Sequence, residues 1–327
     1  MRSLRLLLIF IIIAVFPALG QPQPPGPLQA RPKEYVIDGL AFSPDGRHLA
    51  FVANREALTS QQVYLLTVAS PESIKQLTSG QRWDTYPAFS PDGARLAFSS
   101  SSEPGKQQIK LMDLASGTET SLPGQGEELT WCPAFFRDGQ RIAYGSSTRG
   151  LVVQRLSGEL VKSYNLPSTW ALDLDAAPAG DALALRAIRL EAERAGARPE
   201  GPTIACLSLD LASGRTSELT TWAPLGRSDW AVRWLPDSRS LIVLARRQTG
   251  TLFSSFYRVS AGVAPEVFAP DARPSPARFA IAPDGRTIAF VRSDATKTPQ
   301  IWLMNSDGSN RSEERRVGKE SRSRWWP

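Results

Sequence analysis

The sequence predicts an all-β fold, a β-propeller of about six blades, each built from four antiparallel strands. Three observations support this prediction. A segment centred on Pro-Asp-Gly recurs along the chain, consecutive clear copies are spaced by 46 or 47 residues, and apolar residues alternate with smaller or polar ones beside each copy.

The repeat is clearest in the first part of the chain. Residues 41–51 read AFSPDGRHLAF and residues 88–98 read AFSPDGARLAF. Further copies follow at 134–144, 177–185, 234–243 and 281–290, of which 281–290 is clear, 234–243 is worn and 177–185 is degenerate. A small insertion, which we place at 189–202, lengthens the fourth unit.

Each copy predicts a hairpin, because Asp-Gly between two alternating segments supplies the positive φ that a tight turn needs. A third strand follows, for example at 109–114, and then a short outer strand such as 73–78. Four antiparallel strands repeated with this period describe a propeller blade. Residues 35–310 hold six such units, and a Pro-rich linker at 21–34 precedes them.

The Phe-Ser-Pro-Asp-Gly-x-x-Leu-Ala-Phe element, followed by a Gln-Ile-x-Leu-Met strand, resembles the WD-type repeat of the TolB family. The resemblance covers nearly all of 35–310 and implies a TolB-like, WD-repeat-like propeller. It is weak for function, because similar repeats serve many exported proteins and the propellers of prolyl-oligopeptidase-type peptidases. The family's namesake has an α/β domain ahead of its propeller, where this chain has only the linker. We therefore expect a protein other than TolB itself.

Residues 1–20 have the form of a secretory signal peptide. Arg2 and Arg5 precede an apolar run from Leu6 to Ala18, and small residues follow at the expected cleavage site. The run is short for a membrane-spanning helix, although an uncleaved anchor remains the alternative. We expect a periplasmic or secreted protein without a stable membrane span after cleavage.

Residues 311–327 differ in character from the repeats. The run RSEERRVGKE fits no strand pattern and resembles the translation of a sequencing adapter. We predict that this tail is foreign, a genuine basic tail being the alternative. If so, the last blade is incomplete, and any domain that naturally follows the propeller cannot be seen.

The net charge of +6 is concentrated at the two ends. Without the leader and the tail the chain is close to neutral, so we expect no nucleic-acid partner. The two cysteines, Cys132 and Cys206, are predicted to be small buried strand residues, with a disulfide between them left open.

No catalytic or metal site can be assembled from residues 35–310. The single histidine, His48, follows a turn at a strand start and is predicted to be a surface residue. No Gly-x-Ser-x-Gly elbow occurs, and no phosphate-binding or zinc-binding pattern is present. The recurring turn aspartates are explained by turn chemistry. We expect no cofactor, and enzymatic activity would require a domain beyond this propeller.

Aromatic and acidic residues recur just before the predicted innermost strands, where loops gather at one end of a propeller channel. We predict that they form a rim that binds a protein or small-molecule ligand. They are Trp83, Asp84, Glu128, Trp131, Trp170, Asp229 and Trp230. The alternative is that these tryptophans pack between blades.

Three functions are compatible with the predicted propeller. The first is an exported, non-catalytic scaffold that binds a protein or small ligand on one channel face. The second is the N-terminal propeller of a truncated prolyl-oligopeptidase-type peptidase. The third is a propeller enzyme acting on carbohydrate, such as a lyase, which should bring clustered His, Arg and Tyr to the channel.

Overall fold

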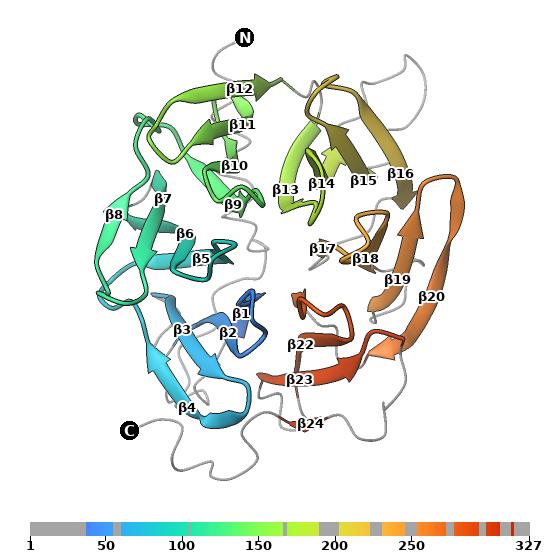
Figure 1. The fold of residues 1–327 in the computed structure, drawn as a ribbon, viewed down its shortest axis with the longest axis horizontal. Coiled ribbons are helices and arrows are strands. Elements are labelled where there is room, and N and C mark those ends of the chain that lie inside the picture. The colour runs from blue at the N-terminus through green and yellow to red at the C-terminus, as the bar shows by residue number, and fades with distance from the viewer. Residues whose placement is uncertain are drawn as a thin grey trace, which may run out of the picture. The chain divides into compact units, whose positions relative to one another are not determined.

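A computed structural model describes residues 37–54, 60–103, 105–165, 169–189, 203–222, 231–245, 254–272, 278–293, 299–307 and 315–316. These residues form six antiparallel sheets of four strands each, arranged in a ring (Figure 1). The predicted six-bladed propeller is confirmed. The predicted signal peptide and linker lie outside the described residues.

Strands succeed one another from the channel outward in every blade. The first blade contains β1 (Ile37–Phe42), β2 (His48–Ala53), β3 (Gln62–Thr67) and β4 (Ser70–Gln76). The second contains β5 (Trp83–Phe89), β6 (Arg95–Glu103), β7 (Lys106–Asp113) and β8 (Glu119–Ser121). The third contains β9 (Thr130–Phe135), β10 (Arg141–Ser146), β11 (Gly150–Arg155) and β12 (Leu160–Tyr164).

The remaining blades follow the same order. The fourth contains β13 (Thr169–Ala176), β14 (Ala182–Arg189), β15 (Thr203–Asp210) and β16 (Thr216–Trp222). The fifth contains β17 (Ala231–Trp234), β18 (Ser240–Ala245), β19 (Ser254–Ser260) and β20 (Val263–Ala272). The sixth contains β21 (Phe279–Ile281), β22 (Thr287–Ser293), β23 (Pro299–Asn305) and β24 (Arg315–Arg316).

The repeated Asp-Gly segment forms the hairpin between the two inner strands. In the first blade, Oδ1 of Asp45 accepts hydrogen bonds from the Arg47 amide at 3.0 Å and the Ser43 hydroxyl at 2.6 Å. The aspartates of the second, third, fifth and sixth blades likewise accept the amide two residues later. The turn aspartates therefore have the structural role that their chemistry predicts.

Apolar side chains on the two faces of each sheet fill the spaces between neighbouring blades. The first and last blades also share such a cluster, in which Leu40 and Phe51 pack with Ala280 and Ile301. The ring is therefore closed by side-chain packing between the first and sixth blades, a point that the repeat pattern leaves undecided.

The hairpin turns also contact one another around the ring. A Cβ added to Gly285 of the sixth blade would lie 2.8 Å from Cδ of Pro236 in the fifth. A Cβ added to Gly46 of the first blade would lie 3.7 Å from Pro283 of the sixth. The proline of one turn thus packs on the glycine of the next, which links neighbouring blades of the ring, including the sixth and the first.

The fourth strand of the sixth blade is only two residues long. β24 pairs with β23 through Arg315 and Arg316, both of which belong to the tail predicted to be foreign. The last blade thus has a much shorter outer strand than its neighbours.

Two further features bear on the sequence predictions. Cys132 and Cys206 are both buried in strands, as predicted, and both thiols are free, a point that the sequence left open. Among the residues that the structure describes, no helix has the length and apolar character needed to cross a membrane.

Candidate ligand site in the central channel

The innermost strands β1, β5, β9, β13, β17 and β21 enclose a cavity of about 350 Å³ in the central channel. All six blades contribute to its wall. The cavity lies at the lower end of the size range of small-molecule sites.

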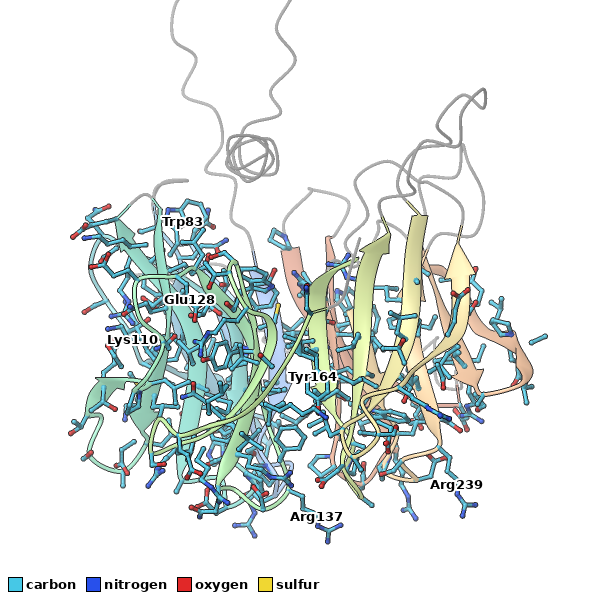
Figure 2. The ribbon with its side chains drawn as sticks, turned by 90° about the horizontal axis from the view of Figure 1, so that it is seen from above. Trp83, Lys110, Glu128, Arg137, Tyr164 and Arg239 are labelled. Carbon is cyan, nitrogen blue, oxygen red and sulfur yellow. The ribbon has the colours of Figure 1, made fainter. Side chains whose placement is uncertain are left out.

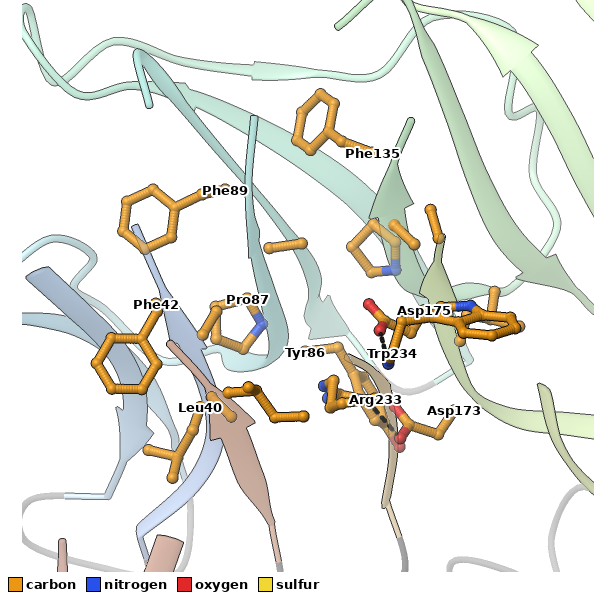
Figure 3. A pocket seen from close by; sticks show the side chains of 18 of the residues that line it. Leu40, Phe42, Tyr86, Pro87, Phe89, Phe135, Asp173, Asp175, Arg233 and Trp234 are labelled. Atoms are coloured by element: carbon orange, nitrogen blue, oxygen red, sulfur yellow. Dashed lines mark hydrogen bonds and ion pairs between the residues drawn. The ribbon is translucent and has the colours of Figure 1, made fainter. Parts of the chain in front are cut away.

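Figure 3 shows two zones in this cavity. One is apolar and contains Phe42, Phe89 and Phe135, with Leu40 and Pro87 beside them. The three phenylalanines occupy the same position in successive blades, one residue before the hairpin turn, so the repeat itself builds this zone. The second zone is polar and contains Tyr86, Asp173, Asp175, Arg233 and Arg278.

Asp173 and Arg233 form the centre of the polar zone. Nη1 of Arg233 donates to Oδ2 of Asp173 at 2.7 Å, and the Val232 amide donates to the same oxygen at 2.9 Å. The Asp173 side chain is 2% exposed and that of Arg233 is 19% exposed. This ion pair joins the fourth and fifth blades within the channel.

Asp175 lies two residues further along β13, with part of its surface open to the cavity. Its Oδ2 accepts the Trp234 amide at 2.6 Å. Loss of water raises the pKa of Asp175 to about 7, and the negative charge of Asp173 adds to this effect, while Arg233 opposes it.

Arg278 and Tyr86 face each other from the sixth and second blades. The Arg278 guanidinium carbon lies 4.9 Å from the centre of the Tyr86 ring, and its Nη2 lies 3.3 Å from the phenolic oxygen. Tyr86 has a φ of 54°, in the left-handed region that non-glycine residues seldom adopt. A register shift between Thr85 and Ala88 accommodates it. The equivalent residues Gly39 and Cys132 have nearly the same φ, so this bulge recurs in the innermost strands of the first three blades.

Arg186 lies behind the polar zone on β14, opposite Asp173 in the strand register. The residue is 9% exposed. Its Nε has no hydrogen-bond partner among the described residues. Loss of water lowers the pKa of Arg186, and the positive charge of Arg278 lowers it further, whereas Asp173 and Tyr86 act in the opposite direction.

The predicted rim residues of the second blade have different environments. Trp83 begins β5 and is 41% exposed, at the end of the strands away from the hairpin residues Arg137 and Arg239 (Figure 2). Asp84 is fully buried, where Arg82 donates to it at 2.8 Å and Thr78 at 2.6 Å. Asp84 therefore supports the blade, and Trp83 is the exposed member.

The predicted residues of the third blade are mostly engaged within the blade. Glu128 accepts hydrogen bonds from Ser146 and Thr148 and forms an ion pair with Arg149. Trp131 is partly buried, and its indole covers Gly145, where an added Cβ would lie 2.3 Å from Nε1. Trp131 thus follows the packing alternative.

The other three predicted rim residues have side chains outside the described part of the chain. Trp170 lies in β13, but its side chain is outside the described residues, as are Asp229 and Trp230 entirely. Of the predicted residues whose side chains the structure describes, Trp83 is the exposed one.

The polar zone of the channel was not predicted from the sequence, although the repeats contain a signal for it. Two residues before the hairpin amide, four blades have alanine, at positions 41, 88, 134 and 280. The fourth and fifth blades have Asp175 and Arg233 there. A charged residue at an otherwise apolar repeat position marks the channel site.

The described part of the chain contains no group of three His, Cys, Asp or Glu side chains placed to hold a metal ion. His48 lies in β2 of the first blade and does not line the cavity.

Comparisons with known proteins agree with this fold. Residues 32–179 match the family model described as the TolB beta propeller domain. A segment of 78 residues is 33% identical to dipeptidyl-peptidase 5 of Porphyromonas gingivalis, covering 21% of this chain and 11% of that protein.

Solved structures show the same architecture at low sequence identity. TolB from Acinetobacter baumannii superposes with a TM-score of 0.57 at 17% identity, over 84% of this chain and 62% of that one. Oligogalacturonate lyase from Vibrio parahaemolyticus gives a TM-score of 0.53 at 13% identity, over 84% of this chain and 92% of that one. A chain of the mitotic checkpoint complex gives a TM-score of 0.54 at 14% identity, over 89% of this chain and 98% of that one. The present chain thus spans less than two thirds of the TolB structure and about a tenth of the peptidase.

Proposed function

We propose, on the premise that this chain is a TolB-like β-propeller, that it is an exported, non-catalytic binding protein that takes a small ligand or a protein segment in its central channel. The observation that carries the proposal is the cavity of about 350 Å³ with an apolar zone and a polar zone. Binding sites for small ligands usually combine apolar surface with a few polar groups that fix the orientation of the ligand.

The chemistry of the polar zone supports binding more than catalysis. The Asp173 carboxylate is committed to Arg233 and to the Val232 amide, so it is held as a fixed charge. Arg278 and Tyr86 present a cation and a phenol to the cavity, which are groups that orient a ligand. The propeller supplies a rigid frame for these groups, since they belong to innermost strands of different blades.

The test uses a variant that fills the channel. Ala41 lies in β1 at the repeat position that Asp175 and Arg233 occupy elsewhere, and it is partly exposed. Ala41→Leu should abolish ligand binding while the melting temperature stays near that of the wild type. Val263→Thr, at a residue 63% exposed on the outer strand β20, is the control and should bind normally. Normal binding by Ala41→Leu would show that the ligand binds outside the channel.

Export is the second part of the proposal and rests on residues 1–20, which have the form of a signal peptide. Expression of the full chain in a Gram-negative host, followed by mass spectrometry of the periplasmic fraction, should give a mature protein that begins at Gln21. A cytoplasmic chain that retains Met1 would contradict this expectation.

The similarity to dipeptidyl-peptidase 5 favours a second candidate function, in which this propeller is the N-terminal part of an exported peptidase. The two candidates are distinguished by the native gene sequence that follows Asn310. A downstream α/β-hydrolase domain with a Gly-x-Ser-x-Gly elbow would establish the peptidase. A stop codon soon after the last strand of the sixth blade would contradict the peptidase and support the binding protein.

A further inference from the structure

We propose that Asp284, in the hairpin turn of the sixth blade, is a modification site, where the chain isomerises its own Asp284–Gly285 linkage to isoaspartate faster than in the other hairpin turns. This modification goes beyond the binding function proposed above and needs no ligand or partner. Two features carry it. The repeat places the same Asp-Gly pair in four turns of one chain, and the hydrogen bonds to the four carboxylates differ.

The reaction takes place between an aspartate and the residue that follows it. The following backbone nitrogen attacks Cγ of the protonated carboxyl group, an N–Cγ bond forms, and the hydroxyl group leaves with the amide proton as one water molecule. Water then opens the five-membered succinimide ring at either carbonyl group. Opening at the backbone carbonyl leaves the chain linked through the side chain, as isoaspartate, with the same atoms as before. Glycine favours the attack because it has no Cβ to obstruct it.

Four hairpin turns between inner strands contain the pair, at Asp45, Asp92, Asp138 and Asp284. All four aspartates are exposed, and the glycines that follow them have φ values between 64° and 72°. In each turn the glycine amide donates to the carbonyl oxygen three residues earlier, at 2.8 or 2.9 Å. Exposure, glycine conformation and amide bonding therefore do not separate the four turns. Two other Asp-Gly pairs, at 38 and 307, lie outside these turns and outside the comparison.

Serine hydroxyl groups hold the carboxylates of the first two turns. Ser43 donates to Oδ1 of Asp45 at 2.6 Å, and Ser90 donates to Oδ1 of Asp92 at 2.5 Å. These bonds are the main reason why the pKa of both aspartates is lowered, because a hydrogen bond to a carboxylate favours its charged form. A bonded and charged carboxylate is protected twice, since the attack requires a protonated group that is turned toward its own backbone.

The third turn is protected by an ion pair, and the sixth has neither kind of protection. Nε of Arg141 donates to Oδ2 of Asp138, while two backbone amides donate to Oδ1. In the sixth blade Ala282 stands in place of the serine. Asp284 accepts one hydrogen bond among the described residues, from the Arg286 amide at 2.8 Å. Asp284 is therefore the least restrained carboxyl group of the four.

Isomerisation at this position would affect the contact between two blades. An isoaspartyl linkage adds one methylene group to the main chain just before Gly285. This glycine packs closely on the fifth blade, since an added Cβ would lie 2.8 Å from Cδ of Pro236. The converted chain should therefore melt at a lower temperature than the unconverted chain.

The test follows the four aspartates in one sample of the full chain, kept folded at neutral pH and physiological temperature for several weeks. Proteolysis and mass spectrometry with electron-transfer fragmentation distinguish aspartyl from isoaspartyl peptides of equal mass. The isoaspartyl fraction at Asp284 should grow at least about fivefold faster than at the other three, because it lacks one charge-assisted hydrogen bond. Asp237, which Ser238 follows, is the internal control and should stay unconverted.

A parallel incubation in urea separates the fold from the local sequence. Unfolding removes the turn hydrogen bonds, so the four Asp-Gly pairs should convert at similar rates. A preference for Asp284 that persists in urea would overturn the proposal, because it would come from the neighbouring residues in the sequence.

Two reciprocal variants assign the difference to the serine hydroxyl. Ala282→Ser supplies the hydroxyl that the sixth turn lacks and should slow conversion at Asp284 about fivefold. Ser90→Ala removes it from the second turn and should speed conversion at Asp92 by a similar factor. Asp284→Glu is the negative control, because glutamate would have to close a six-membered ring, and it should abolish conversion at this position.

Two further outcomes would overturn the assignment. The first is conversion at Asp284 that is no faster than at the other three aspartates of the folded chain. The second is an unchanged rate in Ala282→Ser with a melting temperature equal to that of the wild type. If Ala282→Ser does not fold, Ser90→Ala decides, and an unchanged rate at Asp92 would then reject the role of the hydroxyl.

Discussion

Arg233 of β17 and Asp173 of β13 are joined by a hydrogen bond of 2.7 Å between Nη1 and Oδ2, although the two residues are 60 positions apart. The pair connects the innermost strands of neighbouring blades and holds both charges at fixed positions in the channel.

Replacement of Arg233 by Leu should destabilise the protein by about 3 kcal/mol. The Asp173 carboxylate would remain buried with a hydrogen bond from the Val232 amide but without its cation, and an uncompensated buried charge is costly. Urea denaturation followed by tryptophan fluorescence measures the loss. Arg155→Leu removes an exposed ion pair with Glu159 and should change stability by less than about 0.5 kcal/mol. Equal effects of the two variants would show that the channel pair is not buried in solution.

Asp175 should make stability fall as the pH rises from about 4 to 7. Its folded pKa of about 7 is above the unfolded value of 3.8, so the folded state binds more protons in this window and loses stability as they dissociate. Asp175→Asn should remove this slope, which corresponds to roughly 2–4 kcal/mol between the two ends of the window. Thermal unfolding of both proteins at several pH values tests the expectation, and parallel curves would contradict it.

Gly285→Ala should destabilise the propeller by about 3 kcal/mol. The residue has a φ of +69°, and its new Cβ would lie 2.8 Å from Cδ of Pro236 in the neighbouring blade. Gly262→Ala is the matched control, because Gly262 has a φ of +72° with no atom near the new Cβ. It should cost only the backbone strain of about 1 kcal/mol. The difference, measured by chemical denaturation, isolates the contact between turns, and similar losses in both variants would argue against it.

Trp83→Ala and Trp131→Ala should have opposite consequences. Trp83 is 41% exposed, so its removal should change stability by less than about 0.5 kcal/mol and should weaken partner binding if the predicted rim is used. Trp131 packs on Gly145, and its removal should cost about 2 kcal/mol. Melting temperature and binding are measured together on both variants. A large loss of stability in Trp83→Ala would place this residue in the packing between blades.

The blades are predictable from the sequence and the polar zone of the channel is not, for reasons that particular residues show. Hairpins such as 41–51 are predictable because their turn chemistry and strand alternation involve neighbouring residues. Asp84 was predicted to lie on an exposed rim, but it is buried against Arg82 and Thr78. The meeting of Arg278 with Tyr86 involves residues 192 positions apart and has no local pattern.

The repeats alone predict the number of blades, the order of strands and the role of the turn aspartates, because each depends on interactions within one repeat. The closure of the ring and the meeting of charges in the channel depend on contacts between distant repeats, so they are visible only in the folded protein. The fourth and fifth repeats have Asp175 and Arg233 where the other four repeats have alanine. These charged residues form one site only because closure of the ring brings the innermost strands together around a shared cavity.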